Sequence, residues 1–207
     1  MTLHAATASI RINLPAWLAS ATADLPDTLP TAEDRMRVVN ALADRNHQEG
    51  TGGPFAALVV DNQTGTPIAA GVNLVLSSGL SSAHAEVVAI SLAQARLGSW
   101  DLGADDASHE LIVNWRPCAM CYGAVLWSGV RRLTVAGDGP ELEQLTGFDE
   151  GPMRPDWAEQ LERRAITVTQ NVLRGDAIDV FRRYGDRTDT VVYNARGTGA
   201  HHPGDVW

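Results

Sequence analysis

The spacing of apolar residues along the chain alternates between a helical period and a strand period, and this alternation predicts the secondary structure. In the first half the pattern predicts a helix at 31–47, a hairpin of strands at 55–61 and 68–76, and a helix at 83–97. Thr31 and Ser82 precede the two helices and are suited to cap them. The stretch before them carries three prolines and little periodicity, so we expect an irregular arm over 1–30.

The second half continues the alternation of strands and helices. It predicts strands at 110–115, 131–136 and 166–171, a helix beginning at Pro117, a short helix from 141, a helix through 157–161 and a helix at 176–184. Proline suits the first position of a helix, where its missing N–H has no partner to lose. The alternation indicates an α/β domain over 31–196, with a site at the carboxyl edge of parallel strands. We expect a polar tail over 197–207.

The composition narrows the class of protein. The 207 residues include 44% hydrophobic and 20% charged residues, which is typical of one soluble globular domain. The net charge of −9 argues against a nucleic-acid partner, because such binding depends on Lys and Arg at phosphates. No apolar segment approaches the ~20 residues needed to cross a bilayer, and the start lacks the features of a signal peptide. We therefore expect a cytoplasmic protein that acts on a small molecule and binds neither nucleic acid nor membrane.

Two short motifs carry the candidate chemistry, H-A-E at 84–86 and P-C-A-M-C at 117–121. A catalytic zinc ion keeps three protein ligands so that water can fill the fourth position. The predicted ligands are His84, Cys118 and Cys121. The two cysteines lie three residues apart, so both thiols project from one side of the first turn of a helix, where the helix dipole favours thiolate. Glu86 is then placed to carry protons beside the bound water and not to bind the metal.

A C-x-x-C pair also occurs in redox sites and in structural zinc sites. A redox pair favours a strand directly before it in a thioredoxin-like unit, and a structural site needs a fourth cysteine or histidine. The chain has only two cysteines, and we interpret His201 and His202 as part of a solvated tail. A zinc-stabilised binding module would not need Glu86. The order H-x-E followed by P-C-x-x-C is the signature of zinc deaminases, which favours the catalytic site.

With these motifs located, the chain resembles the cytidine-deaminase superfamily, and within it the guanine-deaminase-like branch. The likeness also rests on GGPFAALVVD at 52–61, AGVN at 70–73 and GFDEGP at 147–152. The resemblance implies a three-layer α/β/α sandwich on a five-stranded mixed sheet. It also implies a homodimer in which C-terminal segments, around Tyr193 and Asn194, are exchanged between the subunits' pockets.

Carried over residue by residue, the resemblance assigns roles around the zinc site. Glu86 is implied as the general acid and base, Glu150 as a second catalytic carboxylate, Asn73 as a hydrogen-bond partner of the purine edge and Phe55 as a stacking ring, with Ala85, Asn114 and Trp115 as further substrate contacts. The implied reaction is the zinc-dependent hydrolytic deamination of a free nucleobase, guanine to xanthine with release of ammonia.

One stretch departs from the family. The usual Thr-Ser-x-Glu before Pro-Cys is replaced here by Val113, Asn114, Trp115 and Arg116. A cation in place of an anion beside the pocket leaves other substrates open, such as a triazine, cytosine, a pterin or a nucleoside such as guanosine. Arg116 could instead face outward in a surface ion pair. A tRNA-editing deaminase needs a basic face for phosphates, which the acidic composition disfavours.

Overall fold

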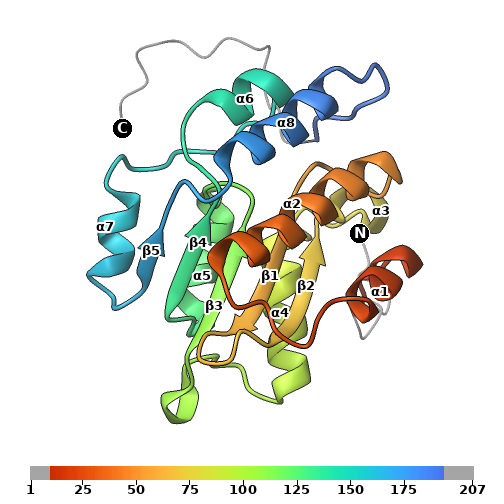
Figure 1. Cartoon of the computed structure of the whole chain (residues 1–207). Coiled ribbons are helices and arrows are strands. Elements are labelled where there is room, and N and C mark those ends of the chain that lie inside the picture. Colours follow the sequence, from red (N-terminus) through yellow and green to blue (C-terminus); the bar gives the residue numbers. More distant parts are fainter. Residues whose placement is uncertain (1–9, 194–207) are drawn as a thin grey trace, which may run out of the picture.

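Five strands form the central sheet, in the order β2-β1-β3-β4-β5, in the computed structural model of the protein, which describes residues 10–193 (Figure 1). The strands are β1 (Ala56–Asp61), β2 (Pro67–Val72), β3 (His109–Val113), β4 (Arg132–Val135) and β5 (Thr167–Thr169). Strand β1 runs antiparallel to both β2 and β3, whereas β3, β4 and β5 are parallel. The sheet is therefore mixed, as predicted, and its three parallel strands end at one edge.

Helices cover both faces of this sheet (Figure 1). One face carries α2 (Ala32–Gln48) and α8 (Arg174–Gly185), and α6 (Glu141–Thr146) packs on α8. The other face carries α4 (Ala85–Leu97) and α5 (Ala119–Ser128). At the two edges of the sheet, α7 (Trp157–Glu162) lies beside β5 and α1 (Ala16–Ala23) lies beside β2. Two short turns, α3 (Val75–Ser78) and η1 (Ala104–Asp106), complete the described elements. This arrangement is the predicted three-layer α/β/α sandwich.

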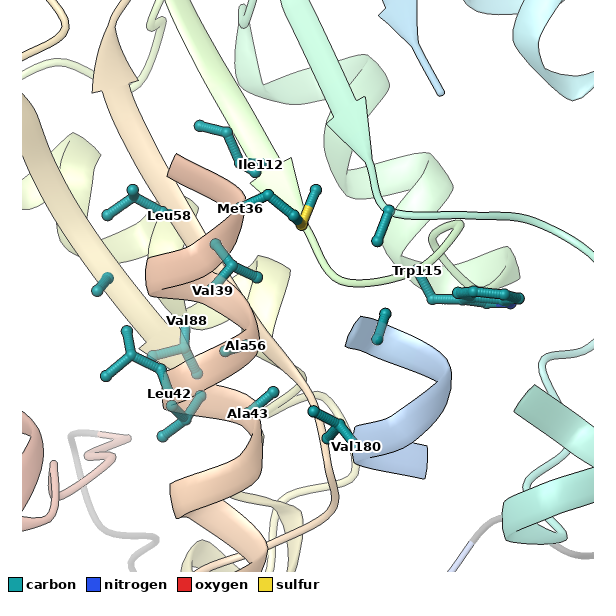
Figure 2. Packing of buried hydrophobic residues seen from close by; sticks show 14 of the residues in the cluster. Met36, Val39, Leu42, Ala43, Ala56, Leu58, Val88, Ile112, Trp115 and Val180 are labelled. Atoms are coloured by element: carbon teal, nitrogen blue, oxygen red, sulfur yellow. The ribbon is translucent and has the colours of Figure 1, made fainter. Parts of the chain in front are cut away.

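The pleat of the strands divides the core into two layers. Alternate residues of β1, such as Leu58 and Val59, belong to different clusters: Leu58 faces α2 and α8, and Val59 faces α4 and α5. Figure 2 shows inward side chains of α2, including Met36 and Val39, packed against the sheet with Val180 of α8 beside them. Because helices bury both faces, residues 56–60 of β1 and 111–113 of β3 are continuous apolar runs in the sequence and do not alternate with polar residues.

Thr31 caps α2, as the sequence predicts. Its hydroxyl accepts a hydrogen bond from the Asp34 N–H at 3.1 Å, and the Asp34 carboxylate accepts one from the Thr31 N–H at 3.3 Å. This reciprocal capping box satisfies two backbone donors that a helix start would otherwise leave unpaired.

The expectation of an irregular arm over 1–30 was wrong for its described part. Residues 16–23 form α1, because Leu18 is buried in the main core and the Trp17 indole donates to the Thr51 hydroxyl at 3.3 Å. These contacts are made to distant segments, so local periodicity does not reveal them. The predicted tail, with Asn194, His201 and His202, lies outside the described residues.

Several element boundaries also differ from the prediction by one or more residues, and three of them lie near the predicted site. The strand predicted at 68–76 ends at Val72, because the Asn73 side chain accepts the Val75 N–H at 3.3 Å and turns the chain into α3. Helix α4 begins after His84, not after Ser82. Pro117 precedes the N-cap of α5, which is Cys118.

None of the helices within residues 10–193 combines the length and the apolar character that crossing a bilayer requires.

Candidate active site

The three predicted zinc ligands meet at two helix starts. His84 is the N-cap of α4, and Cys118 is the N-cap of α5, directly beyond the carboxyl end of β3. Cys121 lies three residues further along α5 and is fully buried. The ligand atoms of the three residues all lie within 4.8 Å of one another. A cap residue is not yet committed to the helical direction, so His84 and Cys118 can both turn their side chains towards Cys121.

The donor set fits zinc by chemistry and by distance. Cys118 Sγ lies 3.5 Å from His84 Nδ1, and two ligands held tetrahedrally at zinc distances of ~2.0 to 2.3 Å also lie about 3.5 Å apart. Hydrogen bonds from Cys121 and His84 lower the pKa of the Cys118 thiol to about 4, so it is a thiolate at neutral pH. Over the described residues the cluster comprises one nitrogen and two sulfur donors, which is the set that zinc prefers.

Two glutamates are buried beside this cluster. Glu86 lies in the first turn of α4, and Glu150 lies in the loop before α7, where its backbone carbonyl accepts the Ala119 N–H at 3.0 Å. Burial and then the Cys118 charge raise the pKa of Glu86 to about 7. Burial, Cys118 and Glu86 raise the pKa of Glu150 to about 8. Neither carboxylate forms a salt bridge with any described residue. Both can therefore take up and release a proton near neutral pH.

These groups line one pocket. The residues around it are Phe55, Asn73, His84, Glu86, Val113, Trp115, Arg116, Phe148, Glu150 and Tyr193. The predicted residues Phe55, Asn73, Glu86, Glu150 and Trp115 are thus brought together with a metal ligand, although they come from segments as far apart in the chain as β1 and the loop before α7. The pocket opens beyond the carboxyl end of β3, as the strand pattern predicted.

Asn73 is held in one orientation. Its carbonyl oxygen, Oδ1, accepts the Val75 N–H, while its buried amide group interacts with the Tyr193 hydroxyl. Asn46 Nδ2 donates to the backbone carbonyls of Asn73 and Gly53, each at 2.8 Å, and so fastens the wall of the pocket. A Cβ at Gly52 would lie 2.0 Å from the Asn73 carbonyl oxygen, so only glycine fits there. The amide group of Asn73 is thereby held in the pocket beside Tyr193.

Aromatic rings form another wall. Phe55 meets Phe148 edge to face, with ring centroids 5.3 Å apart. Tyr193, from the last described segment, lies 4.9 Å from Phe148 and 6.3 Å from the His84 ring. In the described chain Tyr193 therefore lies in the chain's own pocket. Burial raises the pKa of its hydroxyl, so the phenol stays protonated.

Two of the predicted substrate contacts lie outside the pocket lining. Ala85 is fully buried at the start of α4. The Asn114 amide is already engaged: Oδ1 accepts the Ala56 N–H at 3.1 Å, and Nδ2 donates to the Pro54 carbonyl at 2.9 Å. These bonds fix the backbone on either side of Phe55, so the Asn114 side chain holds that ring in position and only its backbone is left for a substrate.

Sequence reasoning left Arg116 open between the pocket and an outward ion pair, assigned no site role to Phe148 or Val113, and missed Asp138 altogether. Arg116 lines the pocket and also forms an ion pair with Asp138, so neither sequence alternative, pocket or outward ion pair, describes it alone. The departure from the family motif at 113–116 was the signal for Arg116. Asp138 follows β4 in a loop, and nothing in the local sequence marks it.

The comparisons with known proteins agree with this geometry. Residues 30–137 match the cytidine and deoxycytidylate deaminase zinc-binding region. The structure of a guanine deaminase from Nitrosomonas europaea is 44% identical, with a TM-score of 0.81, and the alignment covers 86% of this chain and 96% of that one. A related structure in complex with 2,6-diaminopurine is 44% identical, with a TM-score of 0.82 and coverage of 91% and 98%.

A guanine deaminase from Bacillus subtilis is 35% identical over 132 residues, which are 64% of this chain and 80% of that protein. The match at 30–137 spans both H-A-E and P-C-A-M-C, and it ends within the loop that follows β4. The chain belongs to the zinc-binding cytidine and deoxycytidylate deaminase family.

Proposed function

We propose that this zinc-dependent aminohydrolase deaminates a free nucleobase, converting guanine and water to xanthine and ammonia. The observation that carries the proposal is the pair of buried carboxylates, Glu86 and Glu150, whose raised pKa values place both near neutrality beside the cluster of His84, Cys118 and Cys121. The similarity to guanine deaminases over most of the chain supports guanine as the ring.

The two carboxylates divide the proton transfers of the reaction. Zinc bound by His84, Cys118 and Cys121 supplies Lewis-acid activation of water at neutral pH. Glu86 takes a proton from the attacking water and delivers it to the ring nitrogen beside the amino-bearing carbon. Glu150 delivers its proton to the departing amino nitrogen, because ammonia leaves far more readily than an amide anion, and it takes up in exchange the hydroxyl proton that is released when the new carbonyl forms. Both carboxylates are buried, at 6% and 7% exposure.

Phe55, Asn73 and Trp115 hold the ring in this proposal. Phe55 offers an aromatic face for stacking, and the buried Asn73 Nδ2 can donate a hydrogen bond to a ring carbonyl oxygen. The Trp115 indole donates to the Gly139 carbonyl at 3.3 Å and packs edge to face on Phe181, so its ring is a fixed wall of the pocket. A fixed wall favours a planar ring of defined width.

Release of ammonia from a panel of compounds tests the proposal. The panel contains guanine, guanosine, 2,6-diaminopurine, adenine, cytosine, a pterin and an s-triazine, each with purified, zinc-loaded enzyme. We expect guanine to give the highest kcat/KM and xanthine to appear in equal amount with ammonia. A higher kcat/KM with the triazine, cytosine, pterin or guanosine would establish the alternative of another amino heterocycle. Ammonia from an isolated tRNA stem-loop, but not from free bases, would establish an editing enzyme.

We further propose that the enzyme acts as a homodimer in the cytoplasm, on a small molecule and not on nucleic acid. The outer side of α5 supports association of two copies, since residues 119–128 include no charged residue and Trp127 is 85% exposed. Two copies of a chain with net charge −9 repel least where such a charge-free face meets its equivalent. Trp127→Glu should give a monomer by light scattering, whereas Leu76→Glu, at an exposed leucine elsewhere, should not.

The exchange of C-terminal segments stays a prediction. Exchange would place Tyr193 of each subunit in the partner's pocket, where it would occupy the position described above. Mixing Glu86→Gln subunits with subunits that end before Val191 tests it, provided that each alone is inactive. Recovered activity in the mixture supports exchange, because an intact Glu86 then receives a tail from the other subunit. Absence of recovery in a verified mixed dimer contradicts it.

A further inference from the structure

Arg116 is the charged residue that departs from the family motif, and the structure holds its guanidinium firmly at one end. Nε donates to Asp138 Oδ1 at 2.7 Å. Asp138 is itself fixed, because its Oδ1 accepts the Gly139 N–H and its Oδ2 accepts the Trp157 indole N–H, each at 2.7 Å. The Arg116 backbone N–H donates to the Gly137 carbonyl at 2.9 Å. A guanidinium is planar, so fixing Nε fixes the direction of its remaining N–H groups.

The other end of the same guanidinium is not satisfied. Its Nη1 is buried and has no hydrogen-bond partner among the described residues, and the side chain as a whole is 11% exposed. Arg116 lines the pocket together with Glu86 and Glu150. Leaving a buried charged donor unpaired is costly, and native structures rarely do so without a functional reason. A substrate atom is the partner that this position calls for.

The chemistry of arginine restricts that atom. A guanidinium has five donors and no acceptor, and it does not lose its proton in proteins. It therefore hydrogen-bonds to a carbonyl oxygen but not to an amino group, because two N–H donors would then face each other. Guanine and 2,6-diaminopurine differ at one ring edge in this respect, since guanine has a carbonyl oxygen where diaminopurine has an amino group. The amino-bearing carbon that is attacked is the same in both.

We propose that Arg116 Nη1 donates a hydrogen bond to the exocyclic carbonyl oxygen of the purine and so selects oxopurines over diaminopurines. Asp138 is the residue that positions this donor. The proposal rests on the proposed purine deaminase function and adds a specificity determinant to it.

The test compares kcat/KM for guanine and for 2,6-diaminopurine in the wild type, Arg116→Met and Arg116→Lys. Methionine keeps much of the apolar volume and removes the donor. A site built to bond a polar group loses on the order of 10- to 1000-fold in selectivity when that bond is lost. We therefore expect Arg116→Met to lower the guanine-to-diaminopurine ratio of kcat/KM by at least about tenfold. Arg116→Lys should fall between the two, because a lysine cannot hold Asp138 and the substrate at once.

Arg154→Met is the matched control, since Arg154 forms an exposed ion pair with Asp156 and should leave the ratio unchanged. Zinc content and melting temperature are measured for every variant. A ratio that stays within threefold in a folded, zinc-loaded Arg116→Met, including an equal loss on both purines, overturns the assignment of Arg116 while the purine function stands. A wild type that turns over neither purine overturns both proposals.

Discussion

Glu110 and Glu86 are both buried glutamates, yet the fold treats them in opposite ways. Glu110 lies at the second position of β3, under α2, where Arg35 forms an ion pair with one carboxylate oxygen and the Thr134 hydroxyl donates to the other. Arg35 is fixed in turn by donating from Nε to the Leu29 carbonyl at 2.8 Å. Glu86 lies beyond the other end of β3, among thiols, a histidine and a second glutamate, and has no salt bridge with a described residue.

The comparison shows that the charge and hydrogen-bond partners of a buried carboxylate determine whether it can hold and release a proton near neutral pH. At Glu110 a cation and a hydroxyl satisfy both oxygens, so the carboxylate is a structural element that ties α2 to the sheet. At Glu86 burial without such a partner raises the pKa to about 7, so the group can hold or release a proton near neutral pH. Perturbed carboxylates of the second kind are typical of functional sites.

Removal of a metal ligand from the active site should have the largest effect. We expect the Cys118→Ala variant to bind no stoichiometric zinc and to release no measurable ammonia, because the thiolate is a direct ligand. Removal of even a residue that only hydrogen-bonds to a metal ligand lowers metal affinity or activity by ~10- to 100-fold. Elemental analysis of the purified variant measures zinc per chain. A variant that retains one zinc per chain would show that Cys118 is not a ligand.

Glu86→Gln should lower kcat by ~10²- to 10⁴-fold while zinc content and melting temperature are kept, because the amide preserves shape but cannot transfer protons. The contrasting variant is Glu110→Gln, which should lower the melting temperature but leave kcat per folded molecule within threefold. Steady-state ammonia release from both variants measures the contrast. If Glu110→Gln lowers kcat as much as Glu86→Gln, the distinction between a structural and a catalytic glutamate is wrong.

The Arg35→Met variant tests the structural role of the ion pair between Arg35 and Glu110. It leaves the Glu110 charge buried without its cation, and breaking a buried pair in this way costs ~3 to 5 kcal/mol of unfolding free energy. Urea denaturation measures the loss, and zinc content should not change. The double variant Arg35→Met with Glu110→Leu should recover most of the loss, because an apolar pair of similar size needs no charge compensation. Equal stability of the single variant and the wild type would refute the assigned role of this ion pair.

The smallest expected effect is a pH dependence of stability in the metal-free protein. The pKa of Glu150 is raised from 4.5 to about 8, so between these values the folded chain holds a proton that the unfolded chain has released. This contribution is present at low pH and is lost as the pH rises through the window. Glutamine cannot ionise, so Glu150→Gln should gain stability relative to the wild type as the pH rises.

The gain should reach a few kcal/mol at most, at ~1.4 kcal/mol for each pKa unit. Paired melting curves of chelator-treated wild type and Glu150→Gln, across the range from pH 4.5 to about 8, measure it. A stability difference that is flat or falls with pH would mean that Glu150 is not protonated in the folded pocket.

The candidate zinc site and the position of Glu86 beside it were predictable because the signals for them are local. His84, Glu86, Cys118 and Cys121 fall into two motifs whose spacing alone places the donors at helix starts, and the geometry of those starts follows from short-range capping. The positions of the strands were predictable for a similar reason, since each apolar run and each turn is a local signal, whereas the five-stranded mixed sheet was predicted from the family resemblance. The helix start at Thr31 was predicted from Thr31, Glu33 and Asp34, and the structure forms a capping box there.

The remaining features were decided by partners that are distant in the sequence. Asn114 was predicted to contact substrate, but its amide is used by the backbone at Pro54 and Ala56, across 60 and 58 positions. Arg116 enters the pocket wall because Asp138, 22 positions away and itself held by Trp157, fixes its Nε. Helix α1 forms on contacts with Thr51 and the core. A hydrogen bond between residues distant in the sequence follows no periodicity and no fixed spacing. The sequence therefore shows which polar residues are present, but the direction of each side chain is determined only when the layers pack together.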